Sequence, residues 1–197
     1  IQCNYGGDIP MIQLGDLVDY GMRPNEMIKR IKSLVDKKRI IINMLGNHEE
    51  SIMKNDVSRF STERGKKASN YTKSILDKDS MDFIANHMEE GPIERHFGRY
   101  KVLFVHGSLT DIYWGSLNDV EIRKTVYAKY DYVFSGHTHL PNFTESFYPN
   151  DNPEMRNKKK TVFINPGSIG QPRNHSIKAH YSYVDLEDEI FHFNRVS

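Results

Sequence analysis

The sequence contains a single cysteine, Cys3, among its 197 residues, so it cannot form an internal disulfide, and this fits a reducing compartment. It has no apolar run close to the roughly 20 residues that a membrane-spanning helix needs. Residues 1–10 show no basic segment followed by an apolar one, as a signal peptide would. The formal net charge is only +1, which gives no sign of specific nucleic-acid binding. We therefore expect a soluble cytoplasmic protein with no membrane partner, and the sequence leaves its oligomeric state open.

What the sequence does contain is typical of a globular domain. Hydrophobic residues make up 38% and charged residues 27%. The length is enough for one domain with a substantial core and is short for two. Because no internal repeat and no linker divides the chain, we expect one domain over residues 1–197.

Short apolar runs alternate with amphipathic segments, which is the pattern of a layered α/β domain. The expected strands are 9–14, 40–45, 100–105, 132–135, 143–148, 161–165, 180–186 and 189–193. A first helix is expected with Asn25 as its cap, and its apolar face would comprise Met27, Ile28, Ile31, Leu34 and Val35. Two helices are expected within 62–88 and another over 118–129. The basic run 156–160 is expected to be a solvated hairpin loop.

Four of the expected strands end in a turn that carries side chains able to bind metal. The turns are Gly15-Asp16 with Asp19, Gly46-Asn47-His48-Glu49, His106-Gly107 and Gly136-His137-Thr138-His139. In open α/β sheets, ligands bind beyond the carboxyl ends of the strands, so these loops can converge in space. Their oxygen and nitrogen donors suit divalent Mn, Fe, Co, Ni or Zn. The lack of a thiolate argues against a structural zinc site.

Each turn taken alone has a simpler explanation. Gly15-Asp16 and Gly46-Asn47 are ordinary turn dipeptides, and His106 alone could be a hydrogen-bonded structural histidine. Two histidines that flank one residue directly after a strand are harder to explain in this way, and the four turns together favour a site. The other histidines are interpreted as surface or packing residues. They are His87, His96, His175, His180 and His192.

The segments GDLVDYG, GNHE, VHG and SGHTH resemble the signature motifs of the calcineurin-like metallophosphoesterases. The later segment INPGSIGQPR is similar to the small bacterial and archaeal phosphodiesterase branch of that family. The resemblance extends from about Met11 to Arg173. It implies an α/β fold, a two-sheet β sandwich flanked by helices, and the hydrolysis of a phosphate ester.

The resemblance also implies which residues bind metal. Asp16 resembles the carboxylate that bridges two metal ions. Asn47, His106 and His137 resemble ligands of the second ion, and His139 resembles a ligand of the first. The implied cofactor is a pair of divalent transition metal ions, with manganese favoured and iron, cobalt, nickel or zinc also compatible.

His48 resembles the catalytic histidine of the family, and Asp19 resembles the carboxylate that orients it and keeps it charged. Two cations about 3.5 to 4 Å apart would clamp the phosphate and lower the pKa of a bound water from about 15.7 toward about 7. The resulting hydroxide would attack phosphorus in line, while His48 protonates the departing alkoxide.

The sequence departs from the family pattern at its first motif, which is an Asp-x-His on the first strand. Asp8-Ile9-Pro10 lacks the histidine and lies too close to Asp16 for the usual helix between them. Without this pair the first metal ion would keep only Asp16 and His139. We therefore expect that a first strand precedes the sequence as given. The alternative is that residues 1–14 rearrange and leave a poorer site with one metal ion.

A second departure concerns substrate class. Tyr20 stands where phosphoprotein phosphatases carry an arginine that grips phosphate. This favours a phosphodiesterase acting on a small nucleotide-like substrate, with Arg173 as a candidate anion contact. The alternatives are a protein phosphatase and a non-catalytic protein-binding scaffold of the same fold, such as the retromer subunit. His48 favours an enzyme, because a scaffold has no need of it.

Overall fold

The computed structural model describes residues 9–155 and 158–196, and these form two compact units. The first unit ends at Glu90 and the second begins at Gly91. Cys3 and Asp8, on which two of the sequence inferences rest, lie outside the described residues. None of the helices in the described ranges is long and apolar enough to cross a membrane.

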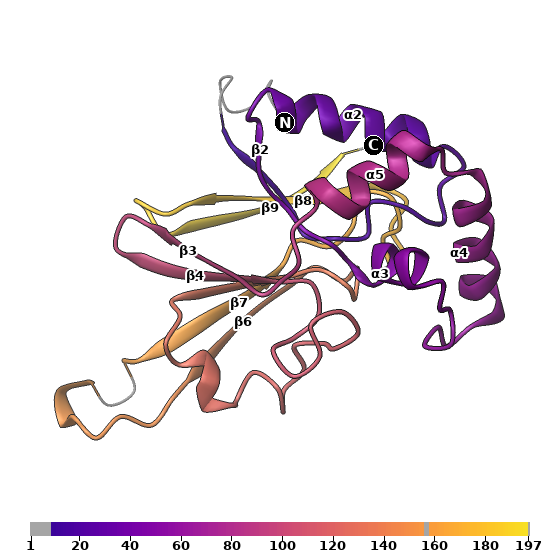
Figure 1. The fold of residues 1–197 in the computed structure, drawn as a ribbon. Coiled ribbons are helices and arrows are strands. Elements are labelled where there is room, and N and C mark those ends of the chain that lie inside the picture. The colour runs from indigo at the N-terminus through magenta and orange to yellow at the C-terminus, as the bar shows by residue number, and fades with distance from the viewer. Residues whose placement is uncertain (1–8, 156–157, 197) are drawn as a thin grey trace. The chain divides into compact units, whose positions relative to one another are not determined.

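From residue 9 on, the first unit contains a two-stranded parallel sheet and helices (Figure 1). Its elements are β1 (Met11–Gln13), α2 (Pro24–Asp36), β2 (Ile40–Asn43), α3 (Asn47–Lys54), α4 (Glu63–Ile75) and α5 (Lys78–His87). Thr62 and Asp77 cap α4 and α5, because their side chains accept hydrogen bonds from backbone N–H groups three residues later. The two helices expected within 62–88 are therefore confirmed.

The expected N-cap of the first helix is wrong. The helix begins at Pro24 with Arg23 as its cap, since the fixed φ of proline suits the first helical position. The Asn25 side chain instead joins distant backbone, donating to the Ile75 carbonyl at 2.8 Å and accepting from Asp77 N at 3.1 Å. The expected apolar face is also wrong at Met27, which is 46% exposed, whereas Ile28 is buried.

The second unit is built on a five-stranded sheet in the order β3-β4-β5-β7-β6, together with the antiparallel pair β8–β9 (Figure 1). The bounds are β3 (Ile93–Phe97), β4 (Tyr100–Val105), β5 (Tyr132–Ser135), β6 (Asn142–Phe147), β7 (Lys160–Asn165), β8 (Ala179–Asp185) and β9 (Ile190–Val196). The central strands β4, β5 and β7 are parallel, so their carboxyl ends lie at one edge of the sheet. Sequence analysis did not predict β3.

The helix expected over 118–129 is wrong, since the only helical turn there is the 3-10 turn η1 (Thr125–Tyr127). The Asn118 side chain accepts hydrogen bonds from Val120 N and Glu121 N, and its carbonyl accepts from Ile122 N, so a capped turn forms there but does not continue as a helix. Within this segment Val120 and Val126 are exposed, whereas Ile122 and Tyr127 are buried.

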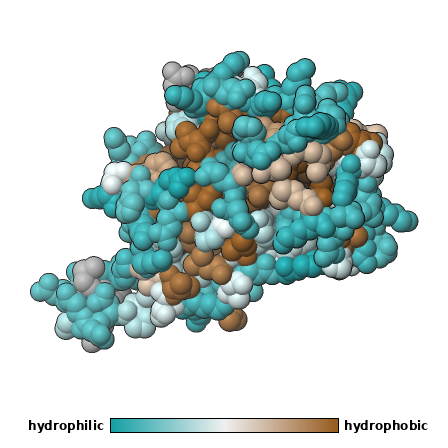
Figure 2. Space-filling model, in the orientation of Figure 1, coloured by the Kyte–Doolittle hydropathy of each residue, from teal (hydrophilic) through white to brown (hydrophobic). Residues whose placement is uncertain are grey.

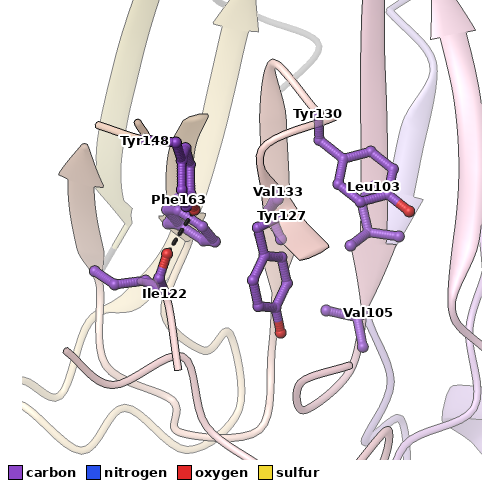
Figure 3. Packing of buried hydrophobic residues seen from close by; sticks show 8 residues of the cluster. All are labelled: Leu103, Val105, Ile122, Tyr127, Tyr130, Val133, Tyr148 and Phe163. Atoms are coloured by element: carbon purple, nitrogen blue, oxygen red, sulfur yellow. Dashed lines mark hydrogen bonds between the residues drawn. The ribbon is translucent and has the colours of Figure 1, made fainter. Parts of the chain in front are cut away.

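The core of the second unit lies against β4, β5 and β7 and contains three buried tyrosines. Figure 3 shows the cluster of Leu103, Val105, Ile122, Tyr127, Tyr130, Val133, Tyr148 and Phe163. The Tyr148 hydroxyl donates to the Ile122 carbonyl at 2.5 Å. The Tyr127 hydroxyl accepts from Leu109 N at 2.8 Å and donates to Glu121 Oε1 at 2.9 Å. These bonds offset the cost of burying the phenol groups.

The connection between β6 and β7 forms a largely hydrophilic projection in Figure 2. Arg156 and Asn157 of the basic run lie outside the described residues. Lys158 is exposed, and Lys160 at the start of β7 pairs with Glu145 across the hairpin at 2.6 Å. The described part of the run thus agrees with the expected solvated hairpin.

Candidate metal centre

In the first unit, the predicted ligands follow the carboxyl ends of two parallel strands. Asp16 follows β1, and Asn47 is the first residue of α3, which comes after β2 and the short connection 44–46. Gly15 has a φ of 94°, which agrees with the tight turn expected there, and Asp16 also has a positive φ of 58°. The chain therefore turns sharply beyond the strand edge, and Asn47 is buried there.

Asp16 lies at the amino end of α3. The backbone N–H of His48 donates to Asp16 Oδ1 at 3.2 Å, and His48 Nε2 is 3.9 Å from Asp16 Oδ2. Both side chains are almost wholly excluded from solvent. The amino end of a helix stabilises a nearby negative charge. The amino end of α3 thus lies beside the carboxyl group that the sequence predicts to bridge two metal ions.

His48 and Asp19 form a buried pair. His48 Nδ1 lies 2.6 Å from Asp19 Oδ2, and Asp19 has no exposed side-chain surface. Burial lowers the pKa of His48, but the carboxylates of Asp16 and Asp19 outweigh it, so the pKa is raised. The rings of Tyr20 and Phe60 form T-shaped contacts with the imidazole, with centroids 5.0 and 5.1 Å away. The imidazole is thereby held in one orientation, and sequence analysis assigned no such role to Phe60.

Glu49 is a further residue whose role the sequence did not reveal. Its carboxylate is fully buried and accepts from the backbone N–H groups of Asp16, Leu17, Val18 and Gly46. Burial and the nearby Asp16 carboxylate raise its pKa, and the N–H groups of Gly46 and Val18 act in the opposite direction. A glutamate three residues after a helix cap is a capping-box pattern, which was the available signal.

In the second unit, His106 and Gly136 follow the parallel strands β4 and β5. Gly136 N donates to the His106 carbonyl at 3.0 Å. The rings of His106 and His137 lie 5.4 Å apart at 72°, and Trp114 lies 6.1 Å from the His137 ring. Two of the predicted ligands are thus neighbours at one edge of this sheet.

His139 has the hydrogen bonding of a metal-binding histidine. Its Nδ1 lies 2.9 Å from the Gln171 carbonyl oxygen, which can only accept, so Nδ1 carries the proton. Nε2 is then the nitrogen that can bind a metal ion, the usual arrangement when a carbonyl orients a ligand histidine. Arg173 N donates to the His139 carbonyl at 3.3 Å, while the Arg173 side chain is exposed. The imidazole nitrogens of the candidate histidines and the side-chain oxygens of Asp16 and Asn47 are donors that suit a divalent transition metal.

The side chain of Asn165, at the end of β7, hydrogen-bonds the turn that carries His137. Its Nδ2 donates to the Gly136 carbonyl at 2.5 Å and to Thr138 Oγ1 at 3.0 Å, and its Oδ1 accepts from Gly167 N at 2.9 Å. In the same segment, Ser168 Oγ accepts from the backbone N–H of Gln171 at 3.0 Å. The segment INPGSIGQPR, which resembles the phosphodiesterase branch, thus also contacts two candidate ligand positions. Asn165 bonds the turn that carries His137, and the Gln171 carbonyl bonds His139.

The remaining histidines are not part of these four turns. His180 is buried, and its backbone N–H donates to the Ser168 carbonyl at 2.9 Å. The other four are exposed, as surface residues would be: His87, His96, His175 and His192.

Residues 11–189 match the sequence profile of the calcineurin-like phosphoesterase superfamily domain. An uncharacterized protein of Methanocaldococcus jannaschii is 28% identical over 181 residues, covering 89% of this chain and 70% of that protein. The crystal structure of a metallophosphoesterase from Sphaerobacter thermophilus aligns with a TM-score of 0.67 at 25% identity, over 98% of this chain and 79% of the other. A hypothetical protein from Pyrococcus horikoshii aligns with a TM-score of 0.76 at 20% identity, over 94% and 74% of the two chains.

The two structural alignments confirm the expected α/β class and its calcineurin-like fold, with sheets flanked by helices. The profile match covers most of the chain, from the strand before Asp16 to the connection between β8 and β9. This chain therefore belongs to the calcineurin-like phosphoesterase superfamily.

Proposed function

We propose that this protein is a binuclear metal-dependent phosphodiesterase that hydrolyses a small nucleotide-like phosphate ester. The observation that supports it most is the buried pair of His48 and Asp19, whose Nδ1–Oδ2 distance is 2.6 Å. Burying an ionisable pair is costly and does little for stability. A protein-binding scaffold gains nothing from that cost, whereas a phosphoesterase gains an oriented proton donor.

The proposed ligands of the two metal ions are Asp16, Asn47, His106, His137 and His139. Each unit presents its share of them beyond the carboxyl edge of its own parallel strands, and their convergence on one metal centre is part of the proposal. A bound pair of cations would neutralise phosphate oxygens and acidify a water molecule that serves as nucleophile. Manganese is the favoured metal, because the oxygen donors of Asp16 and Asn47 suit it and the imidazoles also accept it.

The protein's own residues would then orient the substrate and move the proton. With Nδ1 engaged by Asp19, the His48 nitrogen that faces away from this bond is Nε2, and it would protonate the leaving oxygen. Tyr20 packs on the His48 ring and offers no guanidinium to a terminal phosphate. This supports a diester substrate over a phosphoprotein, with the exposed Arg173 as the candidate anion contact.

The test combines hydrolysis and metal content. The protein is freed of metal with a chelator, and bis-p-nitrophenyl phosphate hydrolysis is followed with and without added manganese. We expect activity only with metal. Asp16→Ala should lose more bound manganese than His139→Ala by elemental analysis, because only Asp16 is proposed to contact both ions. His96→Ala, which changes an exposed histidine of β3, is the control and should keep both properties.

Two results would contradict the proposal. Wild-type protein that binds manganese but hydrolyses no phosphodiester would favour a scaffold, and preference for a phosphoprotein over cyclic nucleotides and dinucleoside polyphosphates would favour a protein phosphatase. Equal metal loss in Asp16→Ala and His139→Ala would contradict the bridging role of Asp16.

A further inference from the structure

The loop after β1 has a backbone shape that creates an anion site. Gly15 and Asp16 both have left-handed φ values, 94° and 58°. This shape turns the N–H groups of Asp16, Leu17 and Val18 toward one point, and successive N–H groups in such a turn form a concavity that binds anions. The group in that concavity is the carboxylate of Glu49, at distances of 3.0, 2.7 and 3.1 Å from the three nitrogens.

The same carboxylate also binds the start of α3. Gly46 N donates to Glu49 Oε2 at 2.8 Å, so Oε2 accepts from Asp16 and Gly46 while Oε1 accepts from Leu17 and Val18. Glu49 has no exposed surface. A fully buried carboxyl group is tolerated only when hydrogen bonds replace its water, and here backbone donors fill both oxygens.

These bonds tie together the two segments that carry Asp16 and Asn47. Asp16 holds a left-handed backbone that an aspartate adopts only at a cost, so its position depends on whatever fixes the loop. We propose that Glu49 is a positioning residue of the metal centre, whose carboxylate locks the loop after β1 against α3 and so holds Asp16 where it can bind metal. This inference rests on the proposed metal-binding role of Asp16.

The geometry indicates which substitutions separate this role from simple packing. In Glu49→Gln the shape is kept, but one oxygen becomes an NH₂ group that faces backbone donors and cannot accept from them. In Glu49→Asp the charge is kept, but the shorter side chain cannot reach both segments. Glu50→Gln is the matched control, because it removes the adjacent charge on the same helical turn, and Glu50 pairs with Lys54 at 2.7 Å.

The first measurement is hydrogen exchange in the metal-free protein. In Glu49→Gln the amides of Asp16, Leu17, Val18 and Gly46 should exchange faster than in the wild type, while those of β4 in the second unit stay unchanged. Glu50→Gln should exchange like the wild type. This measurement requires no metal and no activity, so it tests whether Glu49 fixes the loop after β1 even if the proposed function is wrong.

The second measurement is manganese affinity in folded protein, well below the unfolding temperature. Residues that orient metal ligands typically contribute about 10- to 100-fold to metal affinity, so we expect a loss of that size in Glu49→Gln and in Glu49→Asp. Saturating manganese should restore much of kcat in both, which a general loss of stability would not allow. Glu50→Gln should bind manganese like the wild type.

The outcomes distinguish the two proposals. Wild-type protein that binds no manganese would overturn the proposed function. Wild-type protein that binds manganese, with Glu49→Gln binding it equally tightly and exchanging its loop amides at the wild-type rate, would overturn the role of Glu49. If Glu49→Gln does not fold, Glu49→Asp decides by the same criteria.

Discussion

Replacement of His48 by alanine tests whether this residue is a general acid. The imidazole is held by Asp19 at 2.6 Å and by T-shaped contacts with Tyr20 and Phe60, so it needs little reorganisation before proton transfer. A proton donor helps most when the leaving group is a poor one and contributes little when it is already stable as an anion. His48→Ala should therefore slow alkyl and nucleoside esters far more than p-nitrophenyl esters.

The expected size follows from this fixed geometry. A positioned general acid contributes about 10²- to 10⁴-fold, or about 3 to 5 kcal/mol of activation free energy. Because the ring contacts Asp19, Tyr20 and Phe60, the loss for a nucleoside ester should lie in the upper part of that range. The loss for a p-nitrophenyl ester should stay within about tenfold. Asp19→Asn should show the same selectivity more weakly, because His48 keeps its ring but loses its charged partner.

The assay is a series of phosphodiesters with graded leaving-group acidity, in which log kcat/KM is plotted against leaving-group pKa. The wild type should give a shallow slope and His48→Ala a steep one. His48→Ala also leaves the buried Asp19 without its partner and lowers the folded fraction, but the slope compares substrates on one preparation and does not depend on that fraction. Parallel lines for the two proteins would refute the general-acid role and leave His48 a role in binding alone.

Two further predictions concern the second unit. Tyr127→Phe should lower the free energy of unfolding by about 1 to 3 kcal/mol, since it removes the hydroxyl that accepts from Leu109 N and donates to Glu121. Chemical denaturation would measure this loss, with Tyr71→Phe as the control because Tyr71 is exposed. Equal stability of the two variants would contradict the prediction. Hydrogen bonds from Tyr130, Lys101 and Lys129 lower the pKa of Glu94 to about 2 from its ordinary 4.5, so its contribution to stability is complete above pH 4.5 and is lost as the pH falls toward 2. Glu94→Gln should therefore destabilise at neutral pH and converge with the wild type in acid, and a pH-independent difference between their urea midpoints would contradict this.

The strands that the sequence marks most clearly form the buried parallel centre of the sheet, although the less buried β6 and β8 were also predicted to within one residue at each end. The runs that became β4, β5 and β7 are continuous and apolar, as is typical of the parallel centre of a sheet. Strand β3 was missed because it lies at the edge of the sheet and exposes most of its residues, so its sequence IERHF carries no apolar run. Its pairing with β4 comes from tertiary contact, which local pattern does not encode.

The candidate site also has a part that the sequence indicated and a part that it did not. The types of the proposed ligand residues were evident, because each follows an apolar strand and a turn. The residues that hold them were not evident: Glu49 and Asn165 bind backbone N–H and carbonyl groups up to 33 residues away in the sequence. Backbone groups are present at every position, so these long-range bonds leave no side-chain pattern, and only the local bond of Glu49 to Gly46 carries a signal, the capping box.

The backbone at the candidate ligands explains why such anchors are needed. Five non-glycine residues of the two motif turns have left-handed φ values: Asp16, Asp19, Tyr20, His137 and His139. Each costs about 1 to 2 kcal/mol relative to glycine. Glycine would remove that cost but would also remove the carboxylate or imidazole, so the chemistry of the site dictates the less favourable residue. Such turns persist only where the surroundings fix them. Glu49 does this for the loop after β1 through backbone donors, and Asn165 does it for the turn after β5. The candidate ligands of each unit are thus held within that unit by a buried polar side chain.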